Sequence, residues 1–363
     1  MRTPKIVPPK SFAGLFCEAV SSPELFPLAR LLELIVGKEP VEVERLAGCG
    51  FILPFAWWKK NQHESSLPLP KTLGDDYQVS DYVYGPPIDG KPFKLAMGLR
   101  SLDPGLWLEG GADLEGQLRE RDELIRRSPE VIYGEVKGHL AEVRYFVDLI
   151  IANLHTFHGD TYEISQNKLT HRSTGLVADL KSTRPLLELS RVIAEDLCVL
   201  KKIDGAWTLV AGAVLFPSRW KLNEKIGKNI DQIHTPVPGY TAGLQPYMTP
   251  TFDKITADRA VWRKNWSLHS TDDLHQPESI HAKAEPEEYW WRTERQTLTR
   301  SSESETLLFT IRNRAEPLRW IMGRADESRA FAQTLASMSP ETVEYKGLTA
   351  NHQDIVRALM LTQ

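Results

Sequence analysis

A histidine followed closely by two prolines is the most informative feature of this chain. His234 lies in the sequence Ile-His-Thr-Pro-Val-Pro-Gly-Tyr at residues 233–240, after an apolar segment and a short helical one. Pro236 and Pro238 restrict the backbone just after the histidine, so the imidazole is expected to be held in one direction. A fixed, neutral imidazole is a common ligand of metal ions and haem iron. A histidine that only packs in the core is the alternative, and the sequence leaves it open.

Charged and phenolic side chains surround this histidine in the sequence. Tyr240 follows it, and four basic residues precede it: Arg219, Lys221, Lys225 and Lys228. A neutral imidazole flanked by cations would suit an iron porphyrin, whose two propionates are anionic. A phenol nearby could donate a hydrogen bond to a bound substrate or to oxygen. The residues at 216–220, Phe-Pro-Ser-Arg-Trp, also fit a plain strand end followed by a capped helix.

Two arginines are candidate partners for an anionic group. Arg295 lies in a predicted strand over residues 289–299, on the same face as Trp291. Neighbouring tryptophans indicate that the strand is partly desolvated, and a desolvated arginine needs an anion. A solvated row of charges is the alternative. Arg263 is the second candidate, although an exposed arginine at a helix end would have the same local sequence.

Other chemistry has weaker support. His155, His158 and Asp160 have spacings compatible with a metal site, but a polar helix end explains them as well. The chain contains no GxSxG, P-loop or GxGxxG motif, so acyl transfer, nucleotide chemistry and a dinucleotide site within the chain are not indicated. Electrons for any redox reaction would have to come from elsewhere.

Composition narrows the class of protein. The chain has 363 residues, of which 41% are hydrophobic and 25% charged, as in a soluble protein with a substantial core. A formal net charge of −4 gives no general basic field, so we expect no nucleic-acid partner. Three widely spaced cysteines without a CxxC pair favour a reduced, cytoplasmic setting. We see neither a signal peptide nor a membrane-spanning run and expect no membrane association.

The order of the predicted elements favours an α+β fold with an antiparallel sheet. Residues 1–90 are rich in proline and are expected to form an extension that packs on the core, with one helix near residues 25–36. Strands are predicted at 93–99, 207–216, 289–299 and 306–313, the last two as a hairpin. Helices are predicted at 114–127, 136–154, 185–200 (including Glu195 and Asp196), 243–266 with breaks, and 316–363.

Taken together, these segments resemble the haem-dependent oxidative N-demethylase alpha-subunit-like family, also described as the haem subunit of dimethylamine monooxygenase. The matching blocks occur in one order over roughly residues 90–350. They are Phe-Lys at 93–94, Met-Gly-Leu at 97–99, Glu-Asp-Leu-Cys at 195–198, Phe-Pro-Ser-Arg-Trp at 216–220, Lys225, Gly227, Ile-His at 233–234, Pro-Val-Pro at 236–238, Asn-Trp at 265–266, Glu-Arg-Gln at 294–296, Phe-Thr-Ile-Arg at 309–312 and Tyr-Lys-Gly-Leu at 345–348.

The resemblance implies a PAS-like core over residues 91–350, an antiparallel sheet flanked by helices, followed by a C-terminal helix at 351–363. It implies haem b with His234 as the iron ligand. Arg263 and Arg295 are then the expected propionate partners, Lys225 is a further one, and Tyr240 is the expected polar residue on the distal side of the haem.

The activity implied by the resemblance is oxidation of a small secondary amine such as dimethylamine with O2, which gives a primary amine and formaldehyde. In the family, separate flavin and ferredoxin-type (iron–sulfur) subunits supply electrons from NADPH. A departure from the family lies in the hairpin turn, where an Arg-Leu-Pro turn is usual and this chain has Thr-Arg-Ser-Ser-Glu at 299–303. A non-catalytic haem-binding PAS-type sensor of a gas or ligand, and a relative without haem, are the rival interpretations.

Overall fold

The computed structural model describes residues 84–279 and 284–362. The chain divides into two compact units, Met1–His63 and Glu64–Gln363, and the described residues belong to the second unit. Most of the proline-rich extension predicted at residues 1–90, with its helix near 25–36, therefore lies outside the described residues.

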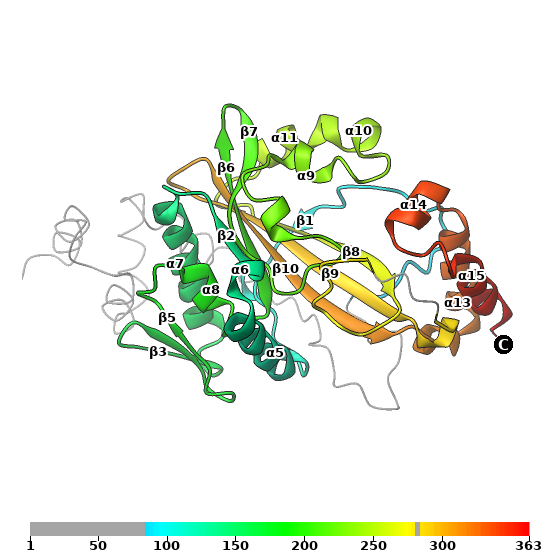
Figure 1. Ribbon diagram of the computed structural model, residues 1–363, viewed down its shortest axis with the longest axis horizontal. Helices are drawn as coiled ribbons and strands as arrows, with labels where there is room; N and C mark the ends of the chain where they lie inside the picture. Colours follow the sequence, from blue (N-terminus) through cyan, green and yellow to red (C-terminus); the bar gives the residue numbers. More distant parts are fainter. Residues whose placement is uncertain (1–83, 280–283, 363) are drawn as a thin grey trace, which may run out of the picture. The chain divides into compact units, whose positions relative to one another are not determined.

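The described part of the chain is built around a large antiparallel sheet (Figure 1). Its strands follow the order β1-β8-β9-β10-β6-β7-β2. They are β1 (Arg100–Ser101), β2 (Tyr133–Glu135), β6 (Glu195–Ile203), β7 (Ala206–Ala213), β8 (Val261–His269), β9 (Trp290–Arg300) and β10 (Thr306–Pro317). All neighbouring pairs are antiparallel. The predicted α+β class and the hairpin of β9 and β10 are confirmed.

The two faces of this sheet carry different side chains, because successive residues of a strand point to opposite sides. On β8 and β9, Arg263 pairs with Gln296, and Lys264 pairs with Arg295. Residues directly opposite each other share a face. Arg263 and Arg295 therefore lie on opposite sides of the sheet, which we call the Arg263 face and the Arg295 face.

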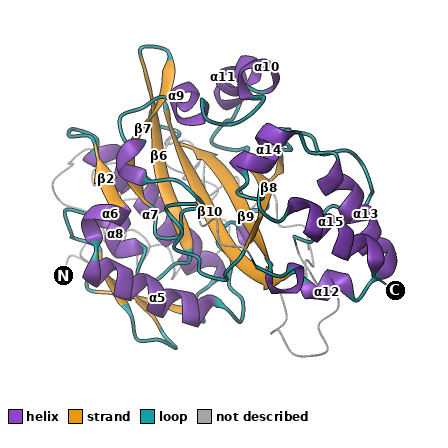
Figure 2. Ribbon diagram, turned by 45° about the vertical axis from the view of Figure 1, so that its right-hand side comes forward, coloured by secondary structure: helices purple, strands orange, loops and turns teal. Residues whose placement is uncertain are grey.

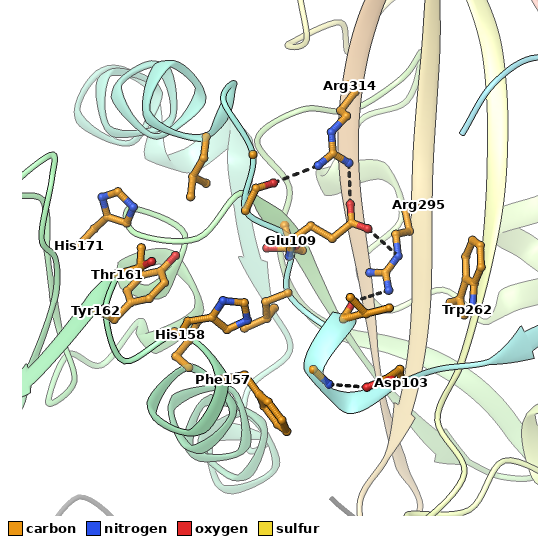
Figure 3. Close-up of a pocket in the computed structure, with 18 of the residues that line it drawn as sticks. Asp103, Glu109, Phe157, His158, Thr161, Tyr162, His171, Trp262, Arg295 and Arg314 are labelled. Atoms are coloured by element: carbon orange, nitrogen blue, oxygen red, sulfur yellow. Dashed lines mark hydrogen bonds and ion pairs between the residues drawn. The ribbon is translucent and has the colours of Figure 1, made fainter. Parts of the chain in front are cut away.

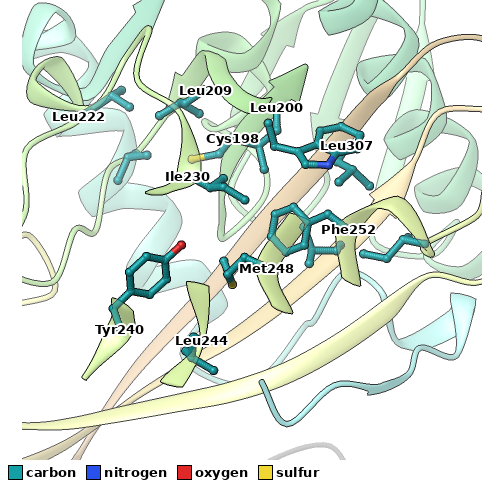
Figure 4. Close-up of a cluster of buried hydrophobic side chains, with 14 residues drawn as sticks. Cys198, Leu200, Leu209, Leu222, Ile230, Tyr240, Leu244, Met248, Phe252 and Leu307 are labelled. Atoms are coloured by element: carbon teal, nitrogen blue, oxygen red, sulfur yellow. The ribbon is translucent and has the colours of Figure 1, made fainter. Parts of the chain in front are cut away.

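Short helices of the β7–β8 connection cover part of the Arg263 face. These are η5 (Leu222–Glu224), α9 (Ile230–His234), α10 (Tyr240–Gly243) and α11 (Gln245–Asp253). They pack on apolar side chains of the sheet in one cluster (Figure 4), which includes Cys198, Leu200, Leu298 and Leu307 from the strands and Ile230, Tyr240, Met248 and Phe252 from the helices. The helix that carries His234 is thus anchored to the sheet by apolar contacts.

Two further groups of elements complete the described structure (Figure 2). One contains η4 (Pro104–Leu106), α5 (Leu114–Arg127), α6 (Pro129–Ile132), α7 (Leu140–Phe157), α8 (Pro185–Leu189) and a small sheet of β3 (Tyr162–Ser165), β4 (Lys168–His171) and β5 (Val177–Asp179). The other contains η6 (Pro286–Glu288), α12 (Arg319–Met322), α13 (Ala325–Ala336), α14 (Pro340–Tyr345) and α15 (His352–Leu361). The predicted helices at 114–127 and in the C-terminal tail are confirmed. No helix among the described residues is long and apolar enough to span a membrane.

Two predicted helices are largely strands. The prediction at 185–200 contains only the short helix α8, and β6 begins at Glu195. Leu197 to Leu200 are buried on both faces of the sheet, and such a continuous apolar run cannot be told from a buried helix by periodicity. The prediction at 243–266 is right for α11, but Val261 onwards is β8.

The predicted strand at 93–99 is an extended segment outside the ladders. Its side chains do alternate, since residues 93, 95, 97 and 99 are half-buried and residues 94, 96 and 98 are exposed. Leu95, Met97 and Leu99 pack against the cluster on the Arg263 face. The period of two thus reflects real burial, although the strand assigned in this region is the two-residue β1 that follows it.

A buried ion pair joins α5 to the start of β6. The side chains of Arg121 and Asp196 are both fully buried, with 2.9 Å between Nη1 and Oδ1. The Asp196 carboxylate also accepts hydrogen bonds from the backbone N–H groups of Leu215 and Phe216, just after β7. The prediction that placed Asp196 in a helix is therefore wrong, because its side chain is buried and paired at the start of β6. Asp196 fixes the chain where it leaves the sheet toward His234.

Candidate functional site

His234 is the last residue of α9, a helix whose start is fixed by reciprocal hydrogen bonds between Asn229 and Gln232. Its Nδ1 lies 2.7 Å from the carbonyl oxygen of Ile230. Because a carbonyl only accepts, Nδ1 carries the proton and donates it, which leaves the lone pair on Nε2. The hydrogen bond of this ring to a described residue is the one made by Nδ1, and none is made by Nε2. This is the tautomer of an imidazole ready to bind a metal through Nε2.

The surroundings of His234 keep its imidazole neutral. Burial lowers the pKa of His234, and the positive charges of Arg263 and Lys225 lower it further, against the hydrogen bond to Ile230. A neutral ring is the form that coordinates a metal. The structure thus brings both of these predicted cationic residues close enough to His234 to act on its charge.

Tyr240 packs against the imidazole of His234. The two rings are stacked, with centroids 5.2 Å apart and an angle of 19° between their planes. The phenol donates a hydrogen bond to the carboxylate of Asp231, on the same helix as His234. Burial raises the pKa of Tyr240, so its proton stays in place. The structure places Tyr240 beside the imidazole of His234, against one face of the ring.

Arg263 is a cation without a hydrogen-bond partner among the described residues. It lies on β8, not at a helix end, and its Nε is buried and unbonded. Burial lowers the pKa of Arg263, and the carboxylate of Glu294 acts in the opposite direction. Lys225 donates a hydrogen bond to the carbonyl of Ile233 at 3.2 Å, next to the histidine. A half-buried guanidinium whose buried Nε–H group has no partner favours an anionic ligand at this place.

Sequence reasoning gave no role to Glu294, Arg292 or Lys346, although it had singled out Arg219 and Arg263. Glu294 accepts hydrogen bonds from the side-chain amides of Asn265 at 3.2 Å and Gln296 at 2.8 Å. Its charge acts on four cations: Arg219, Arg263, Arg292 and Lys346. The signal was present in the sequence, since Glu294 and Gln296 alternate with Arg295 in the predicted strand.

Arg219 and Lys346 line the outer edge of β8. Arg219 donates to the carbonyl of Leu268 at 2.8 Å, and Lys346 donates to the carbonyl of Trp266, also at 2.8 Å. Burial lowers the pKa of Lys346 to about 8, and its ammonium lies 4.6 Å from the centre of the Trp266 ring. Four cations therefore lie within electrostatic reach of the Glu294 carboxylate in this part of the structure.

Arg295 lies apart from the other predicted residues, on the opposite face of the sheet. Its Nε is 3.0 Å from a carboxylate oxygen of Glu109, and its terminal nitrogens donate to the carbonyls of Leu106 and Trp107. Arg314 binds the other oxygen of Glu109 at 2.6 Å. The anion that the tryptophan-rich strand predicted for Arg295 is thus Glu109, a residue far upstream in the chain.

The alternative metal site at the end of α7 is not formed. Within the described residues no group of three or more histidine, cysteine, aspartate or glutamate side chains could hold a metal ion. His155 is exposed near the end of α7, and His158 follows the helix as its C-cap. The interpretation of these residues as a polar helix end agrees with this geometry.

Comparison with known protein families identifies the relatives of this chain. Residues 98–356 match the family model described as haem-dependent oxidative N-demethylase, alpha subunit-like. The match covers well over half of the sequence and includes the β-sheet, His234 and the cations around it. The chain therefore belongs to the haem-dependent oxidative N-demethylase, alpha subunit-like family.

Proposed function

We propose that this chain binds haem b on the Arg263 face, with Nε2 of His234 as the protein ligand of the iron. We propose further that it is the haem subunit of a monooxygenase that removes a methyl group from a small secondary amine. A PAS-like core is part of the proposal. It is supported by the hairpin of β6 and β7, the helices of the β7–β8 connection and the antiparallel return through β8, β9 and β10.

One observation carries the proposal: the half-buried imidazole of His234 has its Nδ1 proton held by Ile230 and its Nε2 lone pair free. The unpartnered Nε of Arg263 also fits haem, because a propionate of the haem would stabilise this cation. Lys225 adds positive charge on the same side. These residues fit an anionic cofactor with a metal at its centre, as the family description implies.

Each residue would then have a defined task. His234 binds the iron, and its hydrogen bond to Ile230 fixes the direction of the ring. Tyr240 stacks on the ring, and its hydrogen bond to Asp231 ties it to α9, so we propose it as a positioning residue. Arg263 and Lys225 would neutralise the propionates. We propose no haem contact for Arg295, which is bound to Glu109 on the other face.

Haem supplies a site at which dioxygen binds and is reduced. For dimethylamine the overall reaction takes the amine, one O2, two electrons and two protons and gives methylamine, formaldehyde and one water. We propose that the electrons come from NADPH through separate flavin and iron–sulfur subunits. The alpha-subunit-like family description supports an assembly of several subunits.

An absorption spectrum of the full chain supplied with haemin tests the binding site. We expect a Soret band that changes on reduction with dithionite and on addition of carbon monoxide. His234→Ala should abolish the native band. His352→Ala is the matched control, since it also removes a half-buried imidazole bonded to a carbonyl, at 2.9 Å from Leu335, but in the C-terminal helices. A full native spectrum in His234→Ala would contradict the assignment.

Turnover tests the proposed reaction separately. The haem-loaded chain with a flavin and iron–sulfur reductase should release formaldehyde from dimethylamine in proportion to the NADPH oxidised. A panel of secondary amines that gives no formaldehyde, although the haem is reduced and binds carbon monoxide, would instead favour a sensor. Haem binding and catalysis are thereby judged by different measurements.

A further inference from the structure

A cavity lies on the Arg295 face of the sheet, away from His234. Its volume is about 520 Å³. Trp262, Arg295, Arg314 and Glu195 line it from the sheet, η4 and the loop that follows line a second side, and the end of α7 with β3 and β4 closes a third (Figure 3). Exposed residues Glu115 and Ser173 also belong to the lining, so the cavity is open to solvent there.

The charges at the floor of this cavity are paired with one another. Glu109 is held between Arg295 and Arg314 and also accepts a hydrogen bond from Tyr84. The remaining N–H groups of Arg295 donate to backbone carbonyls. Arg314 also donates to the carbonyl of Gly110. Glu195, also at the floor, accepts a hydrogen bond from the backbone N–H of Glu109, and burial raises its pKa, which favours the uncharged acid. A ligand with a full charge would therefore find neither a free cation nor a strongly anionic group among the described residues at the floor, and its desolvation would be unfavourable.

Two neutral imidazole nitrogens at this cavity lack a hydrogen-bond partner among the described residues. His171 is 1% exposed, and the Nε2 atoms of His171 and His158 are buried without a hydrogen bond among the described residues. Figure 3 shows both rings at the cavity, with Tyr162 between them. Tyr162 meets their rings edge to face, at centroid distances of 5.2 Å for His171 and 6.5 Å for His158.

Both imidazoles are neutral in this environment. Burial lowers the pKa of His158 and of His171. Nδ1 of His171 lies 2.9 Å from the hydroxyl of Thr174, which can donate or accept, so Nε2 can present either a proton or a lone pair. Leaving such a buried group unbonded is unfavourable, and a ligand that forms the hydrogen bond would remove this cost.

We propose that this cavity is a second binding site, independent of the haem site, for an uncharged, ring-sized molecule that carries a hydroxyl or azole N–H group. The ring would lie against apolar walls that include Leu106, Leu114 and Phe157. The polar group would bond to Nε2 of His171 or His158. The site goes beyond the proposed N-demethylation, because the sheet separates it from His234.

Four probes of similar size test the charge and the hydrogen bond separately: phenol, toluene, benzoate and benzylammonium. Titrations of the full chain followed by NMR of the probes and by calorimetry should show saturable binding of phenol. Toluene should bind about 2–10 times more weakly, the value of one neutral hydrogen bond. Benzoate and benzylammonium should not saturate. Equal binding of phenol and toluene, or no saturable phenol binding, would overturn the proposal.

Substitutions then locate the site. His171→Phe keeps a ring and should remove the advantage of phenol over toluene. His158→Phe repeats the test at a half-buried position, in case the first variant does not fold. His234→Ala should bind phenol as the unchanged chain does, while it loses haem. Loss of phenol binding in His234→Ala with both pocket histidines intact would place phenol on the other face and refute a second site.

Discussion

The buried pair of Arg121 and Asp196 permits a sharp test of how the sheet is tied to the segment that leads to His234. Neither side chain is exposed to solvent. Arg121 also donates to the carbonyls of Ser190, Ala194 and Glu195. The perturbations are Asp196→Asn, Arg121→Met and the combination of both.

The expected cost follows from the charge that each change leaves behind. Asp196→Asn leaves the guanidinium buried without its counter-ion, which costs about 3–5 kcal/mol. Arg121→Met leaves the carboxylate without its counter-ion, held by hydrogen bonds from the Leu215 and Phe216 amides and a long one, 3.5 Å, from the side-chain amide of Asn313, and should cost about the same. The double variant contains neither charge, and the side-chain amide oxygen introduced at position 196 would still accept from those backbone amides. We therefore expect it to lose only about as much as either single variant.

Urea unfolding at pH 7, followed by tryptophan fluorescence, measures the loss in the free energy of unfolding for each of the three variants relative to the unchanged chain. The interaction term of the double-mutant cycle should be at least about 2 kcal/mol, with the double variant more stable than the sum of the single losses predicts. Additive losses within about 0.5 kcal/mol would show that the two charges are not coupled and would refute the reasoning.

Three other predictions concern the two faces and the edge of the sheet. Arg263→Met should weaken haem binding about 10–100-fold, which is the value of one charge-assisted hydrogen bond. The haem affinity of folded Arg295→Met should not change. Equal losses of affinity in a haemin titration of the two variants would contradict the assignment of faces. Gly347→Ala should lower the free energy of unfolding, measured in urea, by about 1–3 kcal/mol. The reason is that φ of Gly347 is +66° and an added Cβ would lie 3.1 Å from Nε of Arg219. Gly98→Ala is the control for the backbone cost alone, since Gly98 has φ +60° and no neighbour within 4 Å of the added Cβ. Burial lowers the pKa of His269 to about 2. Below about pH 6.5 this histidine therefore takes up a proton in the unfolded chain but not in the folded chain. The free energy of unfolding should fall by about 2 kcal/mol between pH 7.5 and pH 5, and His269→Gln should remove that part of the decline.

Local patterns predict the parts of the fold that depend on one segment. The helix at 114–127 has its apolar stripe and charged face within one stretch, and its prediction is correct. The hairpin of β9 and β10 is also predictable, because both strands alternate and a serine-rich turn joins them. β6 escapes prediction because burial on both faces removes the alternation on which a strand prediction relies.

The candidate site was predictable to the extent that it is local in sequence. Lys225, His234 and Tyr240 belong to one connection, and the structure brings them together with Arg263. The partner of Arg295 could not be found, because Glu109 is brought to it only by the packing of a distant loop on the sheet. Pairing across strands likewise decides that neighbouring residues Glu294 and Arg295 face different layers.

The alternation along β9 restricts how this strand can vary in length. Deleting one residue of β9 ahead of Glu294 would shift one part of the strand by one position relative to its neighbours, and the side chains of that part would change faces. Glu294 would then point into the layer of Leu106 and Trp107, and Arg295 would point toward α9. Changes of length are tolerable only where pairing has stopped, at residues 301–305 between the two long strands. A change of length in that turn would leave every residue of the two strands on its present side of the sheet.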